Sequence, residues 1–191
     1  YNEEVRSWGE DYEDCLVTVK DKNDNITIEN ADAKVKVRGN WTTTYDKKPL
    51  RIKFVEKRNM LGLNDGAEMK NWVLLAEYKD GSMLRDKAAL EIARGLLEED
   101  GLYASDAEFA EVEINGEYWG MYTITEDYSD NYFENNYGID NKNIVLIKKG
   151  EVEDGEDADI ELFHDMYHFI TQNDMSVSEN YKKACELLDI G

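Results

Sequence analysis

The sequence contains little proline and little cysteine, and each scarcity excludes a class of protein. Pro49 is the single proline in 191 residues, so no proline-rich linker divides the chain. The two cysteines, Cys15 and Cys185, are too few and too far apart for a disulfide framework or a zinc site. We expect them to be buried free thiols rather than a pair. No run approaches ~18 apolar residues, so no membrane-spanning helix is expected.

Basic residues are also scarce, and this limits the possible partners. The chain has 43 acidic and 22 basic residues, which gives a net charge of −21. This charge repels phosphate backbones and excludes nucleic-acid polymers and anionic membranes as partners. Hydrophobic residues make up 41% of the chain and aromatic residues 11%. That content is sufficient for a folded core, so the acidity does not indicate disorder.

The acidic charge is not spread evenly along the chain. Residues 34–58, called the basic segment below, carry nine basic and two acidic residues, a balance of +7. The remainder of the chain therefore carries −28. The basic residues are Lys34, Lys36, Arg38, Lys47, Lys48, Arg51, Lys53, Lys57 and Arg58.

Strand patterns dominate the first part of the chain and helix patterns the last. Residues 33–38 and 50–54 alternate apolar and basic side chains with a period of two, which is typical of half-buried strands. Asn115-Gly116 predicts a hairpin turn between two further strands. We therefore predict an α+β fold with a largely antiparallel sheet, a packed helix and C-terminal helices. Further elements are expected as strands at 15–20, 26–29, 72–76, 108–114, 117–125 and 143–148, and helices at 83–99, 160–171 and from 176.

The polar loop between the two basic strands is a candidate anion site. Residues 38–48 supply Gly39, several hydroxyls and two lysines, between strands whose polar faces are basic. Such groups suit a polyanionic ligand such as a nucleoside triphosphate. They match no Walker or Rossmann pattern. A solvated basic face that balances neighbouring acidic residues is the alternative.

The predicted helix at 83–99 places a cation among apolar side chains. At about 100° per residue, Arg85 falls within the face formed by Ala88, Ile92 and Leu96. A buried arginine there requires a partner or a ligand. Alternatively, Arg85 lies beyond the packed region and extends to water. Ser82 is expected to cap the N-terminus of this helix, and Gly101 to end it.

Two motifs resemble metal sites but are better explained without a metal. His164 and His168 have zincin-like spacing, yet no third ligand motif follows and both fall on the predicted wet face of their helix. Asp21 to Asn25 begins like a calcium loop, but Ile26 stands where an EF-hand needs glycine. We expect an exposed helix face and an Asx turn, respectively.

Five segments, taken in order, carry a family resemblance. They are Lys36-Val-Arg-Gly-Asn-Trp-Thr42, Lys47-Lys-Pro-Leu-Arg-Ile-Lys53, Asn71-Trp-Val-Leu-Leu-Ala76, Leu84-Arg-Asp-Lys87 and Ile114-Asn-Gly-Glu-Tyr-Trp-Gly-Met-Tyr-Thr-Ile-Thr-Glu126. Together they resemble the spore coat protein H (CotH) kinase family, from about residue 30 to the end. The family has an atypical protein-kinase-like fold and transfers phosphate from ATP to Ser/Thr of secreted or spore-coat proteins.

The resemblance implies a nucleotide site in the first part of the chain. Lys53 would be the phosphate lysine, with Arg51 and Lys48 as alternates, and residues 38–48 would replace the glycine-rich loop. Thr125-Glu-Asp127 would be the hinge that meets adenine. The implied nucleotide-binding residues are Arg38, Asn40, Lys48, Arg51, Lys53, Arg85, Glu91 and Glu126. Glu91 is the candidate acidic partner of the phosphate lysine.

The resemblance also implies a division of the chain. Residues 1–150 would be an N-lobe-like nucleotide-binding part, and residues 151–191 an acidic loop and first helices leading to a C-lobe. The catalytic Asp and the Mg²⁺ ligands are expected in that C-lobe, outside these 191 residues. The location would be extracellular, on the cell surface or in the spore coat of a bacterium. A non-catalytic secreted module that binds protein or carbohydrate is the alternative function.

Overall fold

The protein is described by a computed structural model covering residues 11–148 and 150–188. These residues form two compact units, which divide between Gly138 and Ile139. Each unit is described by itself.

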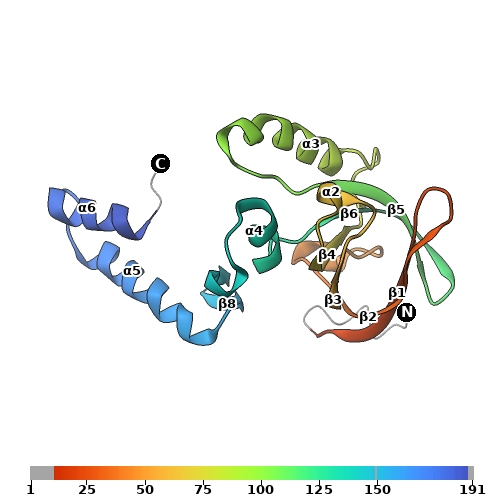
Figure 1. The fold of residues 1–191 in the computed structure, drawn as a ribbon, viewed down its shortest axis with the longest axis horizontal. Helices are drawn as coiled ribbons and strands as arrows, with labels where there is room; N and C mark the ends of the chain where they lie inside the picture. The colour runs from red at the N-terminus through yellow and green to blue at the C-terminus, as the bar shows by residue number, and fades with distance from the viewer. Residues whose placement is uncertain (1–10, 149, 189–191) are drawn as a thin grey trace. The chain divides into compact units, whose positions relative to one another are not determined.

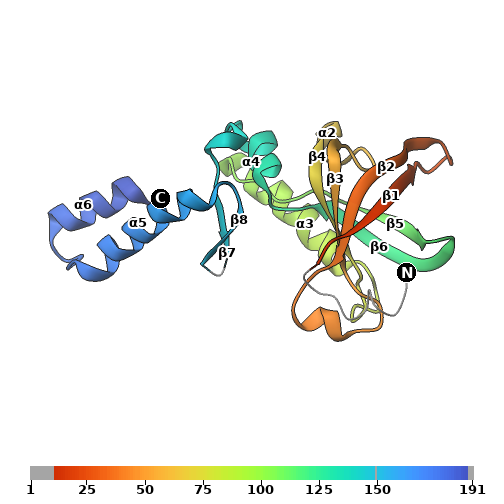
Figure 2. The ribbon, with the colours of Figure 1, turned by 90° about the horizontal axis from the view of Figure 1, so that it is seen from below.

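The first unit is built on one six-stranded sheet with the order β1-β2-β3-β4-β6-β5, in which all neighbours are antiparallel. The sheet is curled, and the two hairpins β1–β2 and β5–β6 form its opposite edges (Figures 1 and 2). The predicted α+β class with an antiparallel sheet is confirmed. The strands are β1 (Glu13–Lys20), β2 (Ile26–Val37), β3 (Leu50–Arg58), β4 (Met69–Leu75), β5 (Ala107–Ile114) and β6 (Glu117–Glu126).

One face of this sheet forms the core. Ile52 of β3 lies opposite Trp72 of β4, and Leu74 opposite Ile124 of β6, so these side chains share one face. Trp72 is fully buried, and its Nε1 donates to the carbonyl of Arg58 at 3.2 Å. The opposite face carries polar residues that alternate with this core, including Lys34 and Lys36 of β2 and Arg51 and Lys53 of β3.

Two predicted turns are confirmed in detail. Asn115 and Gly116 both have positive φ angles, 53° and 79°, and join β5 to β6. The Asp21 carboxylate accepts the backbone N–H of Asn23 at 2.7 Å and of Asn25 at 2.9 Å. The Asn25 side-chain amide also donates to Asp21 Oδ2 at 2.9 Å. This bond, followed by the two backbone bonds, lowers the pKa of Asp21, and together they define the expected Asx turn.

The short helical elements of the first unit connect the strands. They are η1 (Trp41–Thr44), α2 (Leu63–Gly66), α3 (Arg85–Leu97), η2 (Glu98–Asp100) and α4 (Asp130–Tyr137). Two expectations about them were wrong. Leu84 rather than Ser82 occupies the N-cap position of α3. Asp80 Oδ2 accepts the N–H groups of Leu84 and Arg85 at 3.1 and 3.0 Å, and Ser82 Oγ accepts the Leu84 N–H at 3.3 Å. The predicted apolar face of α3, formed by Ala88, Ile92 and Leu96, is exposed, and the helix packs through another side.

The strand predictions also needed correction in two places. The two strands expected at 26–29 and 33–38 are one continuous strand, β2, which passes Asn30 at a φ of 44°. Part of the acidic loop that was expected to begin at residue 151 is a strand, β8 (Glu151–Asp154), because it pairs with β7 (Leu146–Lys148).

The second unit holds the hairpin β7–β8 and two helices, α5 (Ile160–Gln172) and α6 (Ser178–Leu187), with η3 (Asn141–Asn143) and η4 (Asp157–Asp159). His164 and His168 are exposed on α5, as expected. Cys185 on α6 is exposed rather than buried, and Cys15 on β1 is partly buried; both are free thiols. None of the described helices combines the length and the hydropathy that a bilayer crossing requires.

Candidate functional site

Four basic side chains of the basic segment form a patch on the polar face of the sheet. Lys34 of β2 lies directly opposite Lys53 of β3, and Lys36 lies opposite Arg51. Side chains of directly opposed residues share a face and lie about 5 Å apart at Cβ. We call these four residues the cross-strand basic patch. Two like-charged pairs side by side are unfavourable unless anionic groups offset them.

Asp127 neutralises the positive charge of one member of the patch, Arg51. Arg51 Nε lies 2.7 Å from Asp127 Oδ2, and Nη2 donates to Oδ1 at 3.2 Å. The two side chains are 12% and 10% exposed, so the pair is nearly excluded from water. Asp127 follows β6 directly and lies 76 residues from Arg51. No local pattern indicates this pairing, and sequence reasoning missed Asp127 as the partner.

The other three members of the patch are more open. Lys34 lies 3.7 Å from Asp14, but their side chains are 53% and 90% exposed, so solvent screens this contact. The Lys36 ammonium stands 4.5 Å from the centre of the Tyr12 ring. Lys53 is exposed, and within residues 11–148 and 150–188 no hydrogen bond or ion pair engages its ammonium. Lys53 therefore retains its full capacity for a ligand.

The two lysines of the following loop are used by the fold itself. Lys48 is 8% exposed and donates to the carbonyls of Thr43 and, at 2.9 Å, of Tyr45. Lys47 donates to the carbonyls of Ala76, at 2.9 Å, and Met121. Its ammonium also lies 4.1 Å from the centre of the Tyr122 ring.

Lys47 has a partly buried acidic neighbour at the end of β4. Burial lowers the pKa of Lys47, and the negative charge of Glu77 partly reverses this shift. Burial raises the pKa of Glu77, and the nearby carboxylates of Asp86 and Asp80 raise it further, whereas the Thr123 hydroxyl lowers it. This cluster near the start of α3 is acidic, so it does not suit a phosphate group.

The loop that precedes these lysines is closed by its own hydrogen bonds. The Thr43 hydroxyl donates to the Asn40 carbonyl at 2.6 Å, and the Thr44 hydroxyl to the Trp41 carbonyl at 2.8 Å. Gly39 has a φ of 97°, and a Cβ there would collide with the Thr42 hydroxyl. The glycine is thus required by the loop itself. Arg38, which is half-buried, begins the loop with its N–H donated to the Pro49 carbonyl at 3.0 Å.

Glu126 lies at the end of β6, where its side chain is buried. Its carboxylate accepts the Asp106 N–H at 2.8 Å and the Asn64 side-chain amide at 2.9 Å. Burial raises the pKa of Glu126, which these two bonds and the Arg94 guanidinium partly counteract. Arg94 of α3 in turn pairs with Asp106. Glu126 therefore ties the predicted hinge to its surroundings through its side chain.

Arg85 and Glu91 of α3 have partners on or near their own helix. Arg85 Nε lies 3.5 Å from Asp80, and its side chain is 80% exposed, in agreement with the alternative that it extends to water. Glu91 lies 3.1 Å from Lys87. Lys87, which sequence reasoning missed, donates to the Ala107 carbonyl at 2.6 Å and holds α3 against β5.

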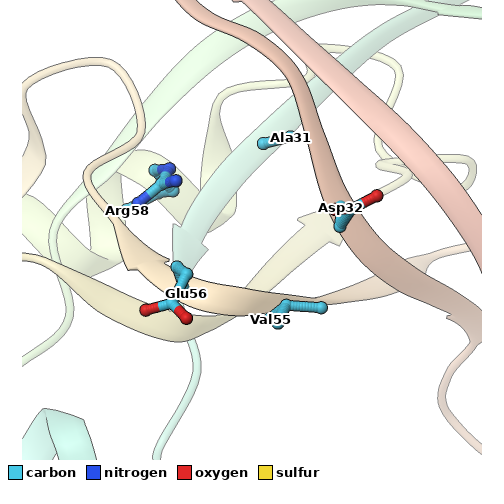
Figure 3. Close-up of a pocket in the computed structure, with 5 residues that line it drawn as sticks. All are labelled: Ala31, Asp32, Val55, Glu56 and Arg58. Atoms are coloured by element: carbon cyan, nitrogen blue, oxygen red, sulfur yellow. The ribbon is translucent and has the colours of Figure 1, made fainter.

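Two further features bear on what the patch could hold: the metal-binding side chains and a hollow beside β2 and β3. In the part of the chain that the structure describes, no group of three or more His, Cys, Asp or Glu residues could hold a metal ion. A hollow between β2 and β3 is lined by Ala31, Asp32, Val55, Glu56 and Arg58 (Figure 3). Its two acids outnumber its one base, so it does not suit an anion.

Comparison with known proteins identifies the family. The model of the CotH kinase protein family matches residues 35–191. The inner spore coat protein H of Bacillus subtilis (strain 168) is 29% identical over 125 residues, which are 65% of this chain. The match covers 30% of that relative's length, so the chain spans well under half of it. The family match includes every residue of the patch except Lys34, and the chain belongs to the CotH kinase family.

Proposed function

We propose that this chain is the ATP-binding part of a CotH-family protein Ser/Thr kinase, and that the cross-strand basic patch holds the phosphates. The observation that carries the proposal is the register of β2 and β3, which sets Lys34 against Lys53 and Lys36 against Arg51. Family membership supports ATP as the nucleotide. ATP carries several negative charges on adjacent phosphates, and these match closely spaced cations.

Electrostatics favours Lys53 as the principal phosphate ligand. Arg51 is neutralised by Asp127, and Lys48 is committed to two loop carbonyls. Lys53 has no such partner among the described residues. The patch also creates a local positive electrostatic field on a chain of net charge −21, and this field attracts a small anion to one face of the sheet.

The rest of the nucleotide would extend from the patch towards the end of β6. Asp127 contacts Arg51 and directly follows Glu126, so the predicted hinge and the patch are joined by one ion pair. We propose that the backbone around Glu126 and Asp127 borders the adenine. Arg38 and Asn40, at the start of the loop after β2, are proposed to border the phosphates from the other side. Arg85 faces Asp80 and Glu91 faces Lys87 at α3, and neither is part of the proposed site.

The catalytic step needs groups that this patch does not provide. Phosphoryl transfer requires a metal ion against the phosphates and a base that orients the acceptor hydroxyl. We propose that the patch binds and orients ATP, and that Mg²⁺ is held by residues of a longer protein. The proposed acceptors are Ser/Thr side chains of secreted or spore-coat proteins, which agrees with the name of the Bacillus subtilis relative.

Calorimetry with ATP tests the proposal. The expected result is saturable binding that Lys53→Ala weakens by about tenfold or more, since one charge-assisted hydrogen bond contributes roughly 1.5–3 kcal/mol. Lys22→Ala, which removes the same charge from the exposed turn after β1, is the matched control and should leave the affinity unchanged. Equal affinity in the wild type and Lys53→Ala would refute the assignment of the patch.

A binding module is the second candidate, because aromatic side chains are exposed near the loop. Trp41 is 76% exposed at the start of η1, and the rings of Tyr45 and Tyr78 stack with centroids 5.1 Å apart. Exposed aromatic rings suit sugar or peptide ligands. Glycan or peptide binding that Trp41→Ala abolishes and Lys53→Ala leaves intact would favour this candidate over the nucleotide site.

A further inference from the structure

Helix α3 exposes a continuous apolar stripe. Leu84 just before the helix is 56% exposed, Ile92 is 63% exposed and Leu96 is 70% exposed. Ala88 is exposed between them. These four residues repeat every fourth position, so they lie one above another on a single side of the helix. We call them the α3 stripe. Contiguous exposed apolar surface of this kind typically marks an interaction site.

A different side of α3 holds the helix against the sheet. The less exposed residues of the helix are Lys87, Leu90, Ala93, Arg94 and Leu97, which gather on one side of it. Lys87 and Arg94 bond to Ala107 and Asp106 at the start of β5 and just before it. At about 100° per residue the middle of this side lies on the far side of the helix from the stripe. Packing on the sheet therefore leaves the stripe uncovered.

Three residues of the stripe, Ala88, Ile92 and Leu96, are arranged symmetrically about Ile92, whereas Leu84 would face Asp100 of the other copy. In an antiparallel pair of α3 helices centred on Ile92, residues whose numbers lie equally far on either side of 92 face each other. Ala88 then meets Leu96 of the other copy, so a small side chain faces a large one. Ala89 meets Gly95, where a Cβ would touch nothing within 4 Å in a single chain. Small residues at these positions permit two helices to approach closely.

The charges that flank the stripe are complementary in the same arrangement. Arg85 lies seven residues before Ile92 and Glu99 seven residues after it, so each Arg85 would face Glu99 of the other copy. Both residues are exposed. Arg85 makes a 3.5 Å contact with Asp80, whose carboxylate is already satisfied by the N–H groups of Ser82, Leu84 and Arg85. The Arg85 guanidinium can therefore reach a partner.

We propose that the α3 stripe binds a second copy of this chain, in an antiparallel two-fold contact centred on Ile92. Two-fold contacts between identical chains place the same residue against itself on the axis, and Ile92 occupies that position. The contact is independent of the proposed nucleotide site. One helix pair buries less than the ~1,200 Å² of a standard interface, so the dimer is weak, with dissociation at micromolar to millimolar concentration.

Sedimentation equilibrium from about 10 μM to 1 mM chain at ~0.15 M salt, where the Debye length is about 8 Å, tests the proposal. The wild type is expected to change reversibly from monomer to dimer. Ile92→Glu places two carboxylates on the axis and should weaken association by at least about tenfold. Leu162→Glu, which alters an equally exposed leucine on α5, is the control and should leave association unchanged.

Charge exchange and cross-linking test the geometry itself. Arg85→Glu and Glu99→Arg should each weaken the dimer, and the double variant should restore it. In a Cys15→Ser/Cys185→Ser background, Ile92→Cys should form a disulfide-linked dimer faster than Tyr118→Cys. A chain that stays monomeric at 1 mM, a dimer that is indifferent to Ile92→Glu, or a double variant that fails to recover would overturn the proposal. So would a longer family protein in which Ile92 is covered by its own chain.

Discussion

Lys48 and Lys53 lie five residues apart in the same basic segment, yet the fold gives their ammonium groups opposite surroundings. Lys48 is 8% exposed and its hydrogen bonds end on two carbonyls of its own loop. Lys53 is exposed on β3 opposite another lysine. In a tight loop, backbone carbonyls that point inward need hydrogen-bond donors from side chains. In a strand, the backbone groups bond to the neighbouring strands, so the side chains are not needed for that purpose. The difference separates cations that hold the fold from cations available to a ligand.

The largest expected effect concerns Asp127, which holds Arg51 inside the fold. Asp127→Ala removes the carboxylate that faces a nearly buried guanidinium, and we expect it to lower the free energy of unfolding by about 3–5 kcal/mol. Urea denaturation followed by circular dichroism measures this. Arg51→Met together with Asp127→Leu removes both charges and should cost much less. If Asp127→Ala lowered the free energy of unfolding by less than about 1 kcal/mol, Arg51 would resemble the solvent-exposed basic residues such as Lys53.

Lys48→Met is expected to have the next largest effect, on stability rather than on binding. The substitution keeps most of the volume but leaves the carbonyls of Thr43 and Tyr45 without their donor, at a cost of about 1–3 kcal/mol. Lys22→Met serves as the control and should be neutral. A variant that kept its urea midpoint but lost ATP affinity would instead make Lys48 the phosphate ligand that the sequence suggested as an alternate.

Lys53→Glu is expected to make the unliganded protein slightly more stable. It replaces a like-charged pair with Lys34 by an opposite-charged one, which gains about 0.2–1 kcal/mol. The same change should abolish measurable ATP binding. Urea denaturation and calorimetry on one sample measure both. A loss of stability would show that Lys53 stabilises the fold, as Lys48 does, and that it is not simply a side chain available to a ligand.

The smallest expected effect is a pH dependence from Glu126, a buried acid among the charges held by the fold. Its pKa in the folded state is raised above the usual 4.5. Below that pH the carboxyl is protonated in both states, and as pH rises the unfolded chain loses its proton first. The contribution of Glu126 to stability is therefore fully present below pH 4.5 and is lost as pH rises through the folded pKa.

Comparison with Glu126→Gln isolates this contribution from the other titrating groups. The stability of the wild type minus that of the variant should be larger at pH 4 than at pH 7. Urea midpoints at both pH values give the difference. A difference that grew with pH would mean that hydrogen bonds from Asp106 and Asn64 outweigh burial and lower the pKa of Glu126.

Sequence reasoning succeeded where local geometry decides the result. The alternation at 33–38 and 50–54 predicted two strands, and their register places the predicted basic faces together. Asn115-Gly116 and Asp21 to Asn25 formed the expected turns because each satisfies its own backbone locally. The helix at 83–99 was found, but its orientation was not, since the sheet holds it through Lys87 and Arg94 and not through its apolar side.

The amino-acid sequence by itself determined the antiparallel strands, the hairpin turns, the concentration of basic charge in residues 34–58 and the family. These follow from periodicity, local backbone satisfaction and residue order. Tertiary structure decided which basic side chains are bound by other parts of the fold. Arg51 pairs with Asp127, and Lys47 donates to the carbonyls of Ala76 and Met121, across separations of 29 to 76 residues. It also decided that the apolar side of α3 remains exposed. Such pairings depend on how distant strands align, and no spacing within one segment encodes them.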